Sequence, residues 1–449
     1  MSNISVFPSG VTVYNKEKAF NGYTLFGAGV GAVLIDMNGR VRKVWEGLNK
    51  SPVKPLPGGR IIGSTGTAFG FGGIEDYVKT LQLDWDGNIE WRFDRGELIT
   101  SADGGSFWAS RQHHDFIREG SACGYYSPAL SPKTEDAYTI LLTHRQHCCP
   151  EMCPNRLLDE RIIQISAGGE ITWEWNASDH FMEMGFRPDE LRHIAEMGED
   201  EDWLHLNAIS ELGPNRHYDA GDARFAPENI ICSSRNDLLI FIIEKATGRI
   251  VWRFGPDQEV AGKYGDTAPI IGQHCVHMIP EGLPGAGNIL CFDNGGMAGI
   301  GTAPLSRGYS RAVEFDPVTF RKVWEYTGAN VHMLEGAGLV TPPLNSRFIS
   351  SAMRLPNGNT LIDQGADGIF REVTPEGETV WEYVNPVKAA NAPPGLDYLV
   401  YRAYRLPYEW VPQLETPEEI SVLPPERGSF TLPGSVPFEL PEGGITRIR

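Results

Sequence analysis

The 449-residue sequence lacks a long apolar run and a secretory leader. No stretch approaches the about 18 uninterrupted apolar residues of a membrane-spanning helix, so the sequence predicts no membrane partner. The first residues, MSNISVFPSGVTVYNKEKAF, contain neither a basic segment nor the apolar run that follows it in a signal peptide. We therefore expect a cytoplasmic protein, or one from which a leader has been removed.

Basic clusters and a disulfide framework are also missing. The formal net charge is −19 at pH 7 and no run of Lys and Arg interrupts it, so a phosphate backbone would be repelled and nucleic acid is excluded as a partner. The cysteines number seven, an odd count, and three of them are bunched at Cys148, Cys149 and Cys153. This pattern is untypical of a secreted disulfide protein and favours reduced thiols.

What the sequence does contain is a repeated phrase centred on tryptophan. A strand-like run and a turn containing Gly precede five of its six copies, which predicts a β-hairpin ending in each copy. The copies are GRVRKVWEG (Trp45), GNIEWRF (Trp91), GEITWEW (Trp173 and Trp175), GRIVWRF (Trp252), FRKVWEY (Trp324) and GETVWEY (Trp381).

A second hairpin phrase follows most copies, as in VKPLPGGRIIGS and SSAMRLPNGNTLIDQ. Two hairpins per repeat give four antiparallel strands, the organisation of a propeller blade, so the sequence predicts an all-β, six-bladed β-propeller. We expect one domain over residues 1–415, a short helical insertion at about 178–202, and an irregular Pro/Glu-rich extension over 416–449. The segment YLVYRAYRLPYEWVPQ could complete a blade or close the ring.

Histidines recur where the innermost strand of a repeat should begin. They are His113 and His114 in RQHHDF, His205 in DWLHLNAI and His274 in GQHCVHM. A single buried histidine is usually a core residue, but three at equivalent positions indicate a ligand site in the open centre of a propeller. The ends of the following strands add His144, Arg145, Arg235, Asp293 and Asn294, and Arg311 begins a further inner strand.

Two other motifs contain metal-ligand residue types. In a regular strand His277 faces the side of Cys275 and away from His274, so we expect it to pack within the blade and HCVH not to chelate one ion. The segment THRQHCCPEMCP has no common zinc spacing, and we interpret it as a cysteine-bearing loop. The acidic run GEDEDW is expected to be a solvated surface.

Several ordered motifs resemble the bacterial and fungal arylsulfotransferase (aryl-sulfate sulfotransferase) family over roughly residues 20 to 410. They are DWLHLNAI, SSRNDLLIFIIEKATGRIVWRFGP, GQHCVHMIP…GNILCFDNG, YSRAVEFDP…VWEY and RLPNGNTLI. The resemblance implies a six-bladed propeller whose funnel holds a transiently sulfated histidine. It also implies a phenolic sulfate as donor, another phenol as acceptor, and no nucleotide sulfate.

Transferred motif by motif, the sulfated histidine corresponds to His274. The resemblance implies His274, His205, His114 and Arg235 as catalytic residues, with His113, Asn207, Arg311 and Asn294 binding substrate. The doubled histidine leaves His113 and His114 as alternatives for the first funnel position. This chain departs from the periplasmic enzymes in lacking their signal peptide, additional N-terminal domain and disulfide, and in adding His144 and the Cys-rich loop.

Three functions remain open from sequence. The first is sulfuryl transfer between phenolic compounds, which needs no cofactor. The second is a metal-dependent lyase, hydrolase or oxygenase in which His114, His144, His205 and His274 hold a divalent ion at the axis. The third is a non-catalytic scaffold, although a scaffold has no need of clustered basic groups. A small aromatic substrate is the expected partner, and homodimerisation is left open.

Overall fold

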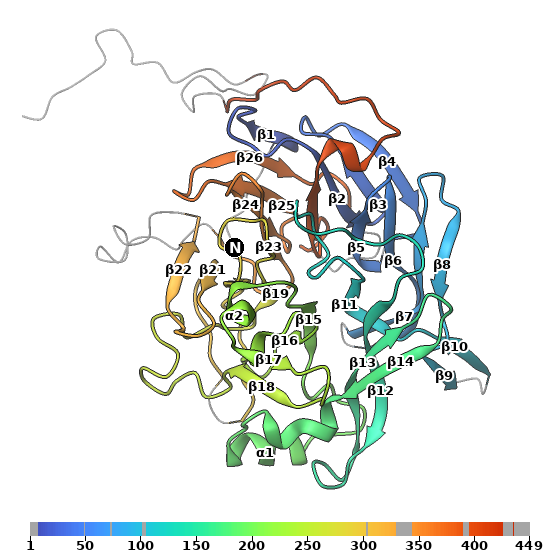
Figure 1. The fold of residues 1–449 in the computed structure, drawn as a ribbon, viewed down its shortest axis with the longest axis vertical. Coiled ribbons are helices and arrows are strands. Elements are labelled where there is room, and N and C mark those ends of the chain that lie inside the picture. Colours follow the sequence, from blue (N-terminus) through green and yellow to red (C-terminus); the bar gives the residue numbers. More distant parts are fainter. Residues whose placement is uncertain are drawn as a thin grey trace, which may run out of the picture.

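The computed structural model describes residues 8–48, 50–71, 74–100, 105–301, 304–328, 344–388, 395–424 and 434. These residues form an all-β propeller, with antiparallel sheets arranged around a central axis and few helices (Figure 1). The prediction of an all-β propeller is thereby confirmed. The predicted C-terminal extension over 416–449 lies largely outside the described residues.

Four sheets stand alone as blades. One joins β27 (Ala403–Leu406), β2 (Tyr23–Ala28), β3 (Gly31–Ile35) and β4 (Val41–Glu46). The second contains β15 (Leu206–Glu211), β16 (Ile230–Ser234), β17 (Leu239–Ile243) and β18 (Ile250–Phe254). The third contains β19 (His274–Met278), β20 (Ile289–Asp293), β21 (Arg311–Phe315) and β22 (Lys322–Tyr326). The fourth has five strands, β1 (Gly10–Tyr14), β26 (Thr379–Val384), β25 (Ile369–Val373), β24 (Thr360–Gln364) and β23 (Ser351–Arg354).

The remaining two repeats share one eight-stranded sheet, so the prediction of six separate blades was wrong. The sheet contains β5 (Lys50–Leu56), β6 (Arg60–Phe71), β7 (Ile74–Leu83), β8 (Ile89–Phe93), β11 (Gln112–Arg118), β12 (Thr139–Cys148), β13 (Arg156–Ile165) and β14 (Ile171–Asn176). The cause is the length of β7, whose first residues extend beyond β8 and leave backbone groups free to bond. Gln112 of β11 pairs with Tyr77 there, which satisfies those groups and fuses the repeats.

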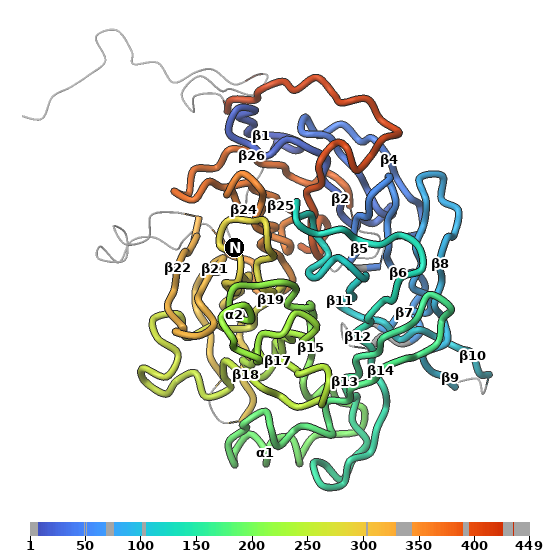
Figure 2. The backbone as a smooth tube through the Cα atoms, in the orientation of Figure 1, coloured from blue at the N-terminus to red at the C-terminus, as the bar shows by residue number. Residues whose placement is uncertain are grey.

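The ring is closed from both chain ends. Strand β27, near the C-terminus, pairs with β2, so YLVYRAYRLPYEWVPQ completes a blade, one of the two roles considered for it. Strand β1, near the N-terminus, pairs in turn with β26 of the last repeat. Figure 2 shows the result, with the red C-terminal segment beside the blue N-terminal strands.

The recurring tryptophans connect neighbouring blades. They lie on the outermost strand of each repeat, and six indole N–H groups donate to the turn between the third and fourth strands of the next repeat. The bonds run from Trp45 to Asp84 O, Trp173 to Lys245 O, Trp175 to Gly248 O, Trp252 to Pro317 O, Trp324 to Pro375 O and Trp381 to Met37 O, at 2.8–3.1 Å. Trp91 differs, because its indole nitrogen has no partner and its ring lies under the Arg118 guanidinium.

The Trp381 bond is expected to matter most, because it joins the last repeat to the first and both partners are buried. Trp381→Phe should lower the free energy of unfolding by about 1–3 kcal/mol, since the Met37 carbonyl is left unpaired. Trp324→Phe is the matched control, with its bond at the surface, and should cost less than about 1 kcal/mol. Urea unfolding measures both, and equal losses would contradict a special role for ring closure.

Helices are short and peripheral. The 3₁₀ helix η1 (Ala177–Glu183) and α1 (Pro188–Ala195) fall in the segment where a helical insertion was expected, and α1 lies at the edge of the ring in Figure 1. The others are α2 (Arg216–Asp219), η2 (Ala223–Phe225) and η3 (Tyr408–Trp410), and a two-stranded ribbon joins β9 (Glu97–Thr100) to β10 (Ser106–Ala109). Among the described residues no helix is long and apolar enough to cross a membrane.

Candidate functional site

Three neighbouring inner strands deliver the predicted histidines. Strands β11, β15 and β19 contact one another in sequence, and each has a register shift near its start. His114 lies within the irregular part of β11 and His205 directly precedes β15, with φ of 47° and 48°, in the left-handed region that non-glycine residues rarely adopt. Such bulges redirect side chains and are frequent beside active sites.

The two strained histidines face each other. Their ring centroids are 4.7 Å apart, and Tyr401 lies 6.0 Å from His114. Burial lowers the pKa of His114 well below its usual value, and the nearby charges of His205 and other histidines add to this. His113 points elsewhere, onto His144, so the structure places His114 and not His113 beside His205.

An aspartate orients His205. The Asp202 carboxylate bonds to Nδ1 of His205 and accepts its backbone N–H at 2.9 Å. Because Nδ1 is engaged, Nε2 is the nitrogen available to a ligand. Asp202 was not predicted, because it belongs to the acidic run GEDEDW, which was expected to be a solvated surface; its position three residues before His205 was a usable signal.

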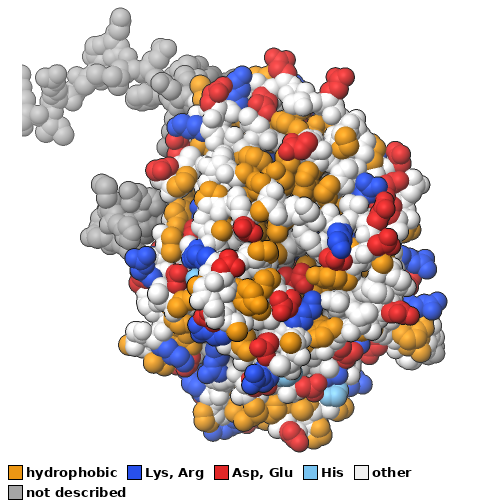
Figure 3. Space-filling model, viewed as in Figure 1, with side chains coloured by type: hydrophobic (Ala, Val, Ile, Leu, Met, Phe, Trp, Pro, Cys, Tyr) orange, Lys and Arg blue, Asp and Glu red, His pale blue; other side chains and the backbone are white. Residues whose placement is uncertain are grey.

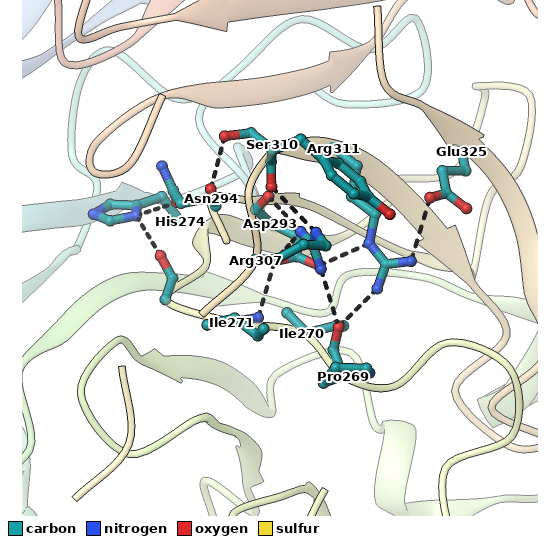
Figure 4. Close-up of polar contacts among 12 residues, drawn as sticks. Pro269, Ile270, Ile271, His274, Asp293, Asn294, Arg307, Ser310, Arg311 and Glu325 are labelled. Carbon is teal, nitrogen blue, oxygen red and sulfur yellow. Dashed lines mark hydrogen bonds and ion pairs between the residues drawn. The ribbon is translucent and has the colours of Figure 1, made fainter. Parts of the chain in front are cut away.

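The tautomer of His274 follows from Asn294 (Figure 4). Both amide hydrogens of Asn294 are used, because Nδ2 donates to Ser346 O at 2.7 Å and to Ile349 O at 2.8 Å. Its Oδ1 must therefore accept, and it lies 2.7 Å from His274 Nδ1. The proton of His274 thus resides on Nδ1, and Nε2 carries the lone pair, which accepts only a long 3.2 Å bond from Ile349 N–H.

Burial and neighbouring positive charge keep this imidazole neutral. The pKa of His274 lies well below its usual value, first because the ring is buried and then because Arg235 is close. Arg235 is half-buried, and no carboxylate among the described residues lies within ion-pair distance of its guanidinium. A cation that lacks a counter-ion beside a neutral lone pair is suited to bind an anion.

A second cluster lies beside these residues, at His113, His144 and Glu160, which we call the His113 cluster. The His113 and His144 rings stack 3.5 Å apart at 4°, and each Nε2 faces a Glu160 oxygen, at 3.1 and 3.6 Å. All three side chains are fully buried. Although burial opposes charge on His144, Asp76 and Glu160 raise its pKa to about 10. No sequence signal pointed to Glu160 beyond a carboxylate within the apolar strand RLLDERIIQI.

The four-histidine metal site is not formed. Within the described ranges, the one set of three or more potential ligand atoms lying within 4.8 Å of one another belongs to the His113 cluster, and it shares only His144 with the predicted four. The cysteine loop is absent from that set, and Cys153 Sγ instead donates to the Ala195 and Met197 carbonyls.

The remaining predicted residues have structural contacts. Arg311 donates to Asp293 at 2.7 Å, to Glu325, and to backbone carbonyls, and it points away from His274 in Figure 4. Asn207 donates to Gln273 O at 2.7 Å and leaves its buried Oδ1 unpaired. His277 bonds Tyr125, which lies between β11 and β12, at 3.0 Å, so its Nε2 contacts a neighbouring repeat and not His274.

Comparison with known proteins gives one family and several similar solved structures. Residues 139–392 match the family described as Arylsulfotransferase (ASST). No curated protein matches. Similar solved structures include a protein of unknown function from Bacteroides caccae (10% identity, TM-score 0.43, covering 86% of this chain and 98% of that one). Virginiamycin B lyase from Staphylococcus aureus is another (12% identity, TM-score 0.35, covering 87% and 88%).

Proposed function

The chain belongs to the arylsulfotransferase family, and from this premise we propose that it is a transferase moving a sulfuryl group from an aryl sulfate to a phenolic acceptor. The observation that carries the proposal is the fixed Nδ1–H tautomer of His274, whose Nε2 lone pair is close to Arg235, a cation with no ion-pair partner among the described residues. Its cytoplasmic location stays a prediction from the sequence.

In the first half-reaction, the Nε2 lone pair of His274 attacks sulfur and gives up the long Ile349 contact. An N–S bond forms while the bond from sulfur to the aryl oxygen breaks, and the phenolate leaves with the electron pair. The Arg235 guanidinium balances the charge on the sulfuryl oxygens. The Nδ1 proton stays on the His274 ring and continues to donate to Asn294 Oδ1, which stabilises the positive ring of the N-sulfated intermediate.

Proton transfer is assigned to His205. Its Nε2 donates a proton to the departing phenolate, and in the second half-reaction it removes one from the acceptor phenol. The acceptor oxygen then bonds to sulfur, the N–S bond breaks, and its electron pair returns to His274 Nε2. Asp202 holds the His205 ring through Nδ1 in both steps. Neither step requires a cofactor.

Incubation with 4-nitrophenyl sulfate and phenol tests the proposal. We expect nitrophenol release that depends on the acceptor, with phenyl sulfate formed in equal amount, because the group is transferred and not hydrolysed. Release with inorganic sulfate as the product, at a rate independent of phenol, would indicate a sulfatase. No release with any aryl sulfate would rule out the proposed reaction.

A further inference from the structure

We propose that the His113 cluster binds one divalent transition-metal ion through His113 Nε2, His144 Nε2 and a Glu160 carboxylate oxygen. The site differs from the four-histidine set considered from sequence, since two of its three ligands are new. It is also independent of the sulfuryl transfer proposed above, because His205, Arg235 and His274 do not belong to it.

The strongest evidence is a convergence of unpaired atoms. His113 Nε2, His144 Nε2 and Glu160 Oε2 are all buried, and none makes a hydrogen bond of good geometry with the described residues, although His113 Nε2 and Glu160 Oε2 lie 3.1 Å apart. Buried polar atoms are rarely left unpaired in native proteins, and several around one point indicate an ion or water that they bind. All three are atoms that coordinate metals.

The donor set and spacing fit a small ion. Two imidazoles and one carboxylate bind zinc and iron(II) at known catalytic centres. Ligand atoms at about 2.0–2.2 Å from a tetrahedral ion are about 3.3–3.6 Å from one another, close to the 3.1 and 3.6 Å from the Glu160 oxygens to the imidazole nitrogens. Binding requires the two stacked rings to splay from their 4° angle so that both lone pairs converge.

The surroundings of the cluster resemble those of a metal site. His144 Nδ1 lies 2.5 Å from Asp76 Oδ1, which gives the carboxylate–histidine arrangement that orients metal ligands. Asp76 is in turn held by Arg111 at 2.7 Å. On the other side, His113 Nδ1 lies 2.7 Å from His114 Nδ1.

Occupancy would fix the tautomer of His114. A metal on His113 Nε2 leaves the proton on Nδ1, which must then donate to His114 Nδ1. His114 would therefore carry its own proton on Nε2. The ion would act as a structural centre between β11, β12 and β13 and would orient one histidine beside His205.

Cobalt(II) and zinc(II) binding to the full chain tests the proposal. Because the ligands are buried, the protein is refolded without metal and then with one equivalent of Co²⁺ or Zn²⁺. We expect about one ion per chain to survive dialysis, visible d–d absorption with Co²⁺, and a Tm at least about 3 °C higher. X-ray absorption should detect two imidazoles and at least one oxygen ligand.

Variants locate the ion. Glu160→Gln keeps the size of the side chain and should weaken Co²⁺ binding at least about 100-fold, while His205→Gln and His274→Gln, the matched controls, should each retain one equivalent. If Glu160→Gln does not fold, the ligands detected by X-ray absorption on the unaltered chain still test the proposed site. Retention of less than about 0.1 ion per unaltered chain after dialysis, or loss of binding in the two control variants, would overturn the proposal. Sulfur-to-cobalt charge-transfer absorption would also overturn it, because it would place the ion at the cysteine loop.

Discussion

His274→Ala is expected to lower kcat for 4-nitrophenyl sulfate by at least about 10³-fold, because the variant has no atom that can accept the sulfuryl group. Phenyl sulfate should bind with little change, since Arg235 remains. Rapid quenching of the unaltered enzyme with donor alone should trap about one sulfuryl group per chain on His274, detected by mass spectrometry, and none on the variant. Loss of turnover together with loss of labelling identifies the nucleophile.

The matched control is His277→Gln. His277 lies three residues further along β19, is equally buried, and bonds Tyr125 between β11 and β12. Its replacement should leave kcat within about threefold while lowering stability by about 1–3 kcal/mol. A sulfuryl group trapped on His205 or His114, or turnover that survives in His274→Ala, would show that another residue is the nucleophile.

The pattern of strands was predictable because it depends on local chemistry. The alternation of apolar and polar residues, the turn glycines and the tryptophan phrase are local signals, and each copy of that phrase forms an outer strand, as expected. The reason for the tryptophan was not predictable, since the indole bonds a turn in the next repeat. The fusion of two repeats depended on an overhang of β7 that strand propensity cannot reveal.

The site was predicted only in part, because local sequence signals exist for some of its residues and not for others. Repeat-equivalent positions pointed to His114, His205 and His274. The regular alternation of a strand could not show the bulges that aim them, and it could not identify partners such as Asp202 and Asn294 that fix their tautomers. The net charge of the chain did not indicate where the site lies, because acidic and basic side chains are interspersed over the face in Figure 3.

A buried ionic cluster joins the inner strands, and sequence gave no indication of it. Asp115 of β11 accepts from Lys54 of β5 and, at 2.9 Å, from Arg402 just before β27. The second Asp115 oxygen also accepts the Ile209 N–H of β15, at 3.2 Å. All three charged side chains are almost fully buried, at 3% exposure. The cluster therefore links four repeats close to the axis.

Asp115→Asn should be the most destabilising single change, with a loss of about 3–5 kcal/mol in the free energy of unfolding. The substitution keeps the size of the side chain but leaves Lys54 and Arg402 as two buried cations without a counter-ion. Glu378→Gln is the control, because it breaks the exposed Lys18–Glu378 pair and should cost less than about 1 kcal/mol. Urea unfolding at pH 7 measures both.

Lowering the pH should remove the stabilisation that Asp115 provides in this cluster. Burial opposes ionisation of Asp115, but Arg402 and Lys54 outweigh it and hold its pKa below the usual value. A carboxyl whose pKa is lower in the folded state stabilises the fold above about pH 4, and this contribution disappears as the pH falls through the folded pKa. The stability gap between the unaltered chain and Asp115→Asn should therefore narrow below pH 4. A gap that stays constant down to pH 2.5 would show that packing, and not charge pairing, is what Asp115 provides.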